Sequence, residues 1–135
     1  MNNKINDSQL IKRLLSDAKR ITNVDLQLIL EKAEKISSMF NSGPLNNVYK
    51  YGQLLIALIK DYYSGNYRQI SWVSVAISVA ALLYILDPID IFPDFLPIIG
   101  QIDDLAVVGL AVRFIKEELD RYEMWCNRNI DVIDV

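Results

Sequence analysis

The chain of 135 residues carries a formal net charge of −3, with 52% hydrophobic residues, one cysteine and no histidine. This length fits a single domain. The lone Cys126 excludes an internal disulfide and fits a reducing compartment, and the lack of histidine removes the commonest general base and transition-metal ligand. Residues 87–135 hold eleven acidic and four basic side chains, so we expect no nucleic acid as the main partner.

Two amphipathic helices are predicted first, over residues 7–20 and 24–40, from apolar residues recurring at helical spacing. Thr22 and Asn23 separate them and are suited to cap the second helix. The Asn-Ser-Gly-Pro run at 41–44 follows. We expect a helical hairpin over residues 1–43, ahead of a helical core over residues 44–127. The first four residues, Met-Asn-Asn-Lys, lead into a polar segment and not into an apolar one, so we expect no secretory signal and a protein that is not secreted.

The third predicted helix covers residues 45–63, and the fourth covers the uncharged run at 69–86. A helix over this run is about 25 Å long at ~1.5 Å per residue, slightly short of a ~30 Å hydrocarbon core. The fifth predicted helix covers residues 103–127. Its apolar first half contains Arg113 and is too short to span a bilayer, and residues 128–135 are expected to be a loose tail. These features favour a soluble or peripherally membrane-bound bundle of about five helices, and an integral hairpin of the last two helices is the alternative.

An acidic, proline-rich segment joins the fourth and fifth predicted helices. Its aspartates, prolines and glycine lie on an apolar background: Asp87, Pro88, Asp90, Pro93, Asp94, Pro97, Gly100, Asp103 and Asp104. One interpretation is structural, since aspartates cap helices and accept hydrogen bonds in turns, and Gly100 permits a positive φ. In that interpretation Arg113 pairs with Asp90 or Asp94.

A cation site is the second interpretation of the same aspartates. Carboxylates without histidine or cysteine suit Ca²⁺ or Mg²⁺, with Asp90, Asp94, Asp103 and Asp104 as the candidate ligands. The spacing does not match an EF-hand loop. A hydrolytic role would have Tyr84 and Arg113 as the only evident helpers, and no nucleophile motif or phosphate-binding glycine loop accompanies them.

Residues 81–104 resemble the signature of the YkvA-like family of small bacterial proteins. The shared pattern is an apolar helix ending in Tyr84, followed by Pro-x-Asp-x-x-Pro-Asp-x-x-Pro-x-x-Gly-x-x-Asp-Asp and a second apolar helix. The likeness covers roughly residues 45–125, and Asp87 departs from it where members often have serine. The resemblance implies an all-helical domain and no known activity, and members are often described as membrane proteins.

The sequence therefore predicts an all-α bundle that acts as a non-enzymatic interaction module. Its expected partner is a membrane surface or a membrane protein on the cytoplasmic side. Exposed aromatic residues are candidates for the contact surface, with core packing as the alternative role: Tyr62, Tyr67, Trp72 and Trp125.

Overall fold

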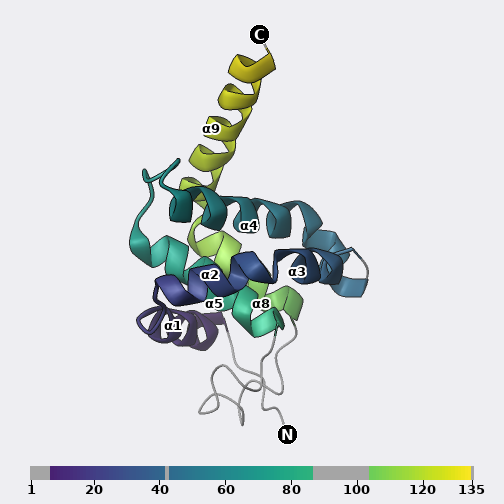
Figure 1. Ribbon diagram of the computed structural model, residues 1–135. Helices are drawn as coiled ribbons and strands as arrows, with labels where there is room; N and C mark the ends of the chain where they lie inside the picture. The colour runs from purple at the N-terminus through teal and green to yellow at the C-terminus, as the bar shows by residue number, and fades with distance from the viewer. Residues whose placement is uncertain (1–6, 42, 87–103, 135) are drawn as a thin grey trace, which may run out of the picture.

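The computed structural model describes residues 7–41, 43–86 and 104–134, and this part of the chain is helical without strands (Figure 1). The elements are α1 (Asp7–Ala18), α2 (Asn23–Glu31), α3 (Ala33–Met39), the 3₁₀ helix η1 (Gly43–Val48), α4 (Tyr49–Ser64), α5 (Trp72–Leu86), α8 (Asp104–Phe114) and α9 (Lys116–Asp134). The predicted all-α class is confirmed. The helices outnumber the predicted five because two of the predicted helices are broken.

The breaks lie at Lys32 and Ile115. Lys32 leaves helical geometry, with φ −102° and ψ 14°, and separates α2 from α3. Ile115 separates α8 from α9, yet its N–H still donates to the carbonyl of Ala111 at 3.2 Å. The apolar periodicity continues through both bends, so it does not reveal them.

The predicted loose tail over residues 128–135 is corrected, because α9 continues to Asp134. Residues 128–134 contain neither glycine nor proline. Extending a formed helix costs far less than starting one. Figure 1 shows α9 extending away from the other helices toward the C-terminus.

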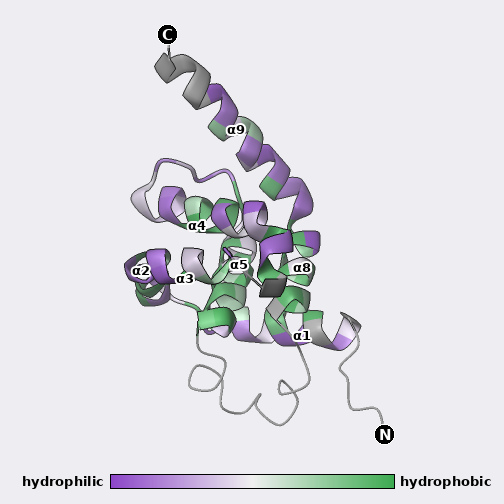
Figure 2. Cartoon of the chain, turned by 90° about the vertical axis from the view of Figure 1, so that its right-hand side faces the viewer, coloured by the Kyte–Doolittle hydropathy of each residue, from purple (hydrophilic) through white to green (hydrophobic). Residues whose placement is uncertain are grey.

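Helix α5 is the centre of the fold. Every side chain from Ser74 to Ile85 is buried, and α5 packs against α1, α2, α3, α4 and α8. Figure 2 shows the apolar α5 inside, with the more polar helices around it. Its uniform apolarity is therefore that of a helix covered on all sides. None of the helices in the described ranges is both long and apolar enough to cross a bilayer.

The first helices belong to the same core as the rest of the molecule. Helix α1 packs against α5 and α8, whereas α2 packs against α4 and α5. Leu14 of α1 and Leu26 of α2 join the single cluster of buried residues that includes α5. Helices α1 and α2 therefore both bury apolar residues in this shared core, and the predicted hairpin over residues 1–43 stays a prediction.

Two glycines shape α4. A Cβ atom added at Gly52 would lie 2.7 Å from the ring of Phe40, so the glycine lets the end of α3 close against α4. Gly65 has φ 88° and ends α4 in the left-handed conformation that favours glycine.

Candidate functional site

Most of the predicted Asp/Pro motif lies outside the described residues: Asp87, Pro88, Asp90, Pro93, Asp94, Pro97, Gly100 and Asp103. The cation site and the pairing of Arg113 with Asp90 or Asp94 therefore stay predictions. Asp104 is the first residue of α8, in agreement with the predicted helix start. Tyr84 is buried in α5, and Arg113 is exposed on α8.

A carboxylate from α9 caps the beginning of α5. Glu118 accepts a hydrogen bond from the Ser71 N–H at 2.9 Å, and further bonds from the hydroxyls of Ser71 and Ser74. Burial alone would raise the pKa of Glu118, but these three bonds and the charge of Arg121 together hold it below its ordinary value. The negative charge lies at the positive end of the α5 dipole, so Glu118 fixes α9 onto α5.

A second anchor joins α9 to α4. The buried Tyr122 hydroxyl donates to the Asp61 carboxylate at 2.5 Å, and burial together with this bond raises the pKa of Tyr122. The ring of Tyr67 lies 5.0 Å from the rings of both Tyr122 and Trp125. Tyr67 is buried and Trp125 half-buried, so these two predicted surface aromatics have mainly a packing role.

The third feature is an exposed surface where α2 begins, α4 ends and α5 begins. We call it the aromatic surface and define it by its residues: Thr22, Asn23, Val24, Tyr62, Arg68, Trp72 and Val73. The Arg68 guanidinium lies 4.5 Å from the centre of the Tyr62 ring, and the rings of Tyr62 and Trp72 are 6.0 Å apart. Five of these residues, all except the two valines, line a hollow of about 400 Å³. The aromatic surface therefore combines the exposed Trp72 ring and the half-buried Tyr62 ring with a cation.

Two exposed valines directly follow residues of the hollow in the chain. Val24 at the start of α2 is 70% exposed, and Val73 at the start of α5 is 47% exposed. The sequence predicts Trp72 and Val73 in the uncharged helix over residues 69–86, with Trp72 as a candidate contact residue. They escape burial because they form the first turn of α5, ahead of the segment that the other helices cover.

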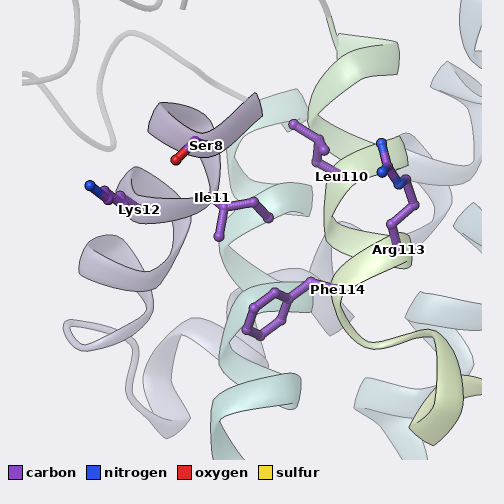
Figure 3. A pocket seen from close by; sticks show the side chains of 6 residues that line it. All are labelled: Ser8, Ile11, Lys12, Leu110, Arg113 and Phe114. Atoms are coloured by element: carbon purple, nitrogen blue, oxygen red, sulfur yellow. The ribbon is translucent and has the colours of Figure 1, made fainter. Parts of the chain in front are cut away.

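The fourth feature is a hollow of about 470 Å³ between α1 and α8 (Figure 3). Its lining comes from two segments about 100 residues apart: Ser8, Ile11, Lys12, Leu110, Arg113 and Phe114. The sequence analysis missed it because the packing of α1 against α8 cannot be read from helical periodicity. Phe114 is 46% exposed although it lies in the apolar first half of the fifth predicted helix.

Comparisons with known proteins find relatives whose function is unknown. Residues 74–110 match the model of the family described as a protein of unknown function, DUF1232. The chain is 41% identical over 68 residues to a Bacillus subtilis (strain 168) protein named uncharacterized membrane protein YkvA. That match covers 50% of this chain and 64% of the Bacillus protein. No solved structure matches the chain. The two matches confirm the predicted resemblance to YkvA-like proteins of unknown function.

Proposed function

We propose that this chain is a non-enzymatic helical module that docks peripherally on the cytoplasmic face of a membrane. The name of the Bacillus relative connects that protein to a membrane. In the present chain the most apolar helix, α5, is covered by its neighbours from Ser74 to Ile85. Contact with a bilayer would therefore be made by side chains on the outside of the bundle.

The aromatic surface is the observation that carries this proposal. Tryptophan and tyrosine prefer the boundary between lipid headgroups and acyl chains, because their rings are apolar and carry one polar group. Trp72 is 37% exposed and stands beside the more exposed Val73. Arg68 adds a positive charge that attracts anionic headgroups.

Basic side chains near this surface add to the attraction. Lys19 and Arg20 are exposed in the turn that leads to Thr22. An exposed basic side chain near an anionic membrane contributes about 1 kcal/mol, and the contribution decreases with added salt. The combination favours a membrane with anionic lipids over a neutral one.

Vesicle flotation tests the proposal. We expect the full chain to float with vesicles of phosphatidylcholine and phosphatidylglycerol, to float poorly with phosphatidylcholine alone, and to be released by high salt. Trp72→Ala and the double change Val24→Ser, Val73→Ser should each weaken vesicle binding by about tenfold, which corresponds to the loss of a buried apolar side chain.

Met124→Ser is the matched control, because Met124 is an exposed apolar residue on α9 that lines a different hollow from the one in the aromatic surface. It should leave flotation unchanged. Two results would contradict the proposal: no binding of the wild-type chain to either vesicle, or equal losses in the control and the aromatic-surface variants. Retention in membranes until detergent is added would instead indicate an integral protein.

A further inference from the structure

The hollow between α1 and α8, which we call the α1–α8 groove, has the size of a small-molecule site. Its volume of about 470 Å³ falls within the range of roughly 300–1,000 Å³ that ligand pockets occupy. In Figure 3 the side chains of Ile11, Leu110 and Phe114 lie between the two helices. Lys12 extends from the outer side of α1, and Arg113 lies on α8.

The floor of the groove is apolar and incompletely covered. Leu110 is almost buried and Ile11 is half-buried, whereas the Phe114 ring remains 46% exposed. Protein interiors are normally packed as densely as organic crystals, so a hollow beside an exposed aromatic ring leaves apolar surface in water. An apolar ligand in the groove would remove that surface from water.

The charges around the groove select the ligand. Among the described residues that line the groove, Lys12 and Arg113 are cations and none is acidic. A ligand with an apolar tail and a negatively charged head matches both the floor and the edges.

We propose that the α1–α8 groove binds an acyl chain of an anionic membrane lipid. The acyl chain lies against Ile11, Leu110 and Phe114, and the headgroup lies near the Lys12 ammonium, with Arg113 adding positive charge. This inference rests on the proposed function and extends it, because it names a lipid held by the docked protein. It assigns to Phe114 and Lys12 a role in binding that is separate from that of the aromatic surface.

A soluble, short-chain lipid tests the groove without any vesicle. The probe is dihexanoyl phosphatidylglycerol below its critical micelle concentration, added to the full chain and followed by calorimetry and by NMR shifts. Dihexanoyl phosphatidylcholine, with the same tails and a neutral headgroup, is the comparison lipid. We expect the anionic lipid to bind about tenfold more tightly, as one charge-assisted contact implies.

Two variants with matched controls locate the site. Phe114→Ala and Lys12→Glu should each weaken binding of the anionic lipid by about tenfold or more. Met124→Ala removes an exposed apolar side chain on α9, and Lys60→Glu reverses an exposed charge on α4, so both should bind like wild type. Phe114 and Lys12 are themselves exposed, and thermal melting of each variant verifies that it is folded.

The groove proposal and the docking proposal fail in different ways. If the wild-type chain ignores the short-chain lipid, or if all four variants bind it equally, the groove proposal is overturned, whatever the flotation result. Self-association of the wild-type chain that Phe114→Ala abolishes would also overturn it, because the groove would then contact a second copy. Binding of the short-chain lipid without flotation on vesicles would support the groove and contradict docking.

Discussion

Helices α1 and α9 both bury acidic or hydroxyl groups, but they satisfy them differently. On α9, Glu118 accepts three hydrogen bonds at the start of α5, and Tyr122 donates one to Asp61. On α1, Asp17 is only 4% exposed, and its Oδ2 atom accepts no hydrogen bond from the described part of the chain. On α9 hydrogen bonds therefore compensate for the burial of the polar groups, whereas on α1 the Asp17 Oδ2 atom is buried without this compensation.

The difference predicts opposite responses to pH. Burial raises the pKa of Asp17 from 3.8 to about 6, although Arg20 and Arg13 act to lower it. The pKa of Glu118 is instead held below its ordinary value. Protonation of Asp17 thus stabilises the attachment of α1, and protonation of Glu118 weakens the attachment of α9. A change in pH therefore strengthens one attachment and weakens the other.

The largest effect is expected for Asp17→Asn. Because the folded chain binds the Asp17 proton more tightly than the unfolded chain does, this carboxyl's contribution to stability is complete below 3.8 and is lost as the pH rises through about 6. Removing the charge should raise the free energy of unfolding near neutral pH by at most about 3 kcal/mol. Urea unfolding at a series of pH values measures both the gain in the free energy of unfolding and the loss of its pH dependence.

Asp120→Asn is the control for that experiment. Asp120 is about half exposed and pairs with Lys116 at 2.8 Å, an exposed arrangement in which solvent screens the attraction between the charges. It should change stability slightly and leave the pH dependence near 6 intact. If Asp17→Asn destabilises the chain at neutral pH, the carboxylate has a stabilising partner and the contrast between α1 and α9 is wrong.

Tyr122→Phe is expected to have the next largest effect, in the opposite direction. The change keeps the buried ring but leaves the Asp61 carboxylate without its donor. Loss of a hydrogen bond to a charged group costs about 1.5–3 kcal/mol. Thermal or urea unfolding checks this, with Tyr49→Phe as the exposed control that should change little. An unchanged unfolding midpoint for Tyr122→Phe would show that the hydrogen bond from Tyr122 to Asp61 does not hold α9 in place.

The sequence predicted the helices better than their partners. Helical spacing located α1, α4 and α5. The Thr22 N–H donates to the Asp25 carboxylate at 2.9 Å, in agreement with the predicted cap of α2. Asp17 itself lies three residues after Leu14 on the apolar stripe of α1, so the sequence carried a signal of its burial.

The surfaces and anchors depend on contacts between distant segments. Ser71 and Glu118 are 47 residues apart, and the α1–α8 groove joins segments about 100 residues apart. Amphipathic periodicity states which face of a helix is buried, but it does not state which helix covers that face. For the same reason the sequence did not reveal that α1 and α2 both pack against α5.

The smallest of the three effects is expected for Glu118→Gln. The amide keeps one oxygen as an acceptor but loses the charge at the start of α5, so the free energy of unfolding should decrease by about 1 kcal/mol near neutral pH. Because the pKa of Glu118 is lowered by folding, its contribution is present above its ordinary value and is lost as the pH falls. Glu117→Gln, an exposed neighbour on the same helix, is the control and should have almost no effect. In acid the Glu118→Gln difference should disappear while that of Asp17→Asn also becomes small. A Glu118→Gln penalty that persists unchanged in acid would show that the side chain acts by packing, and not by its charge.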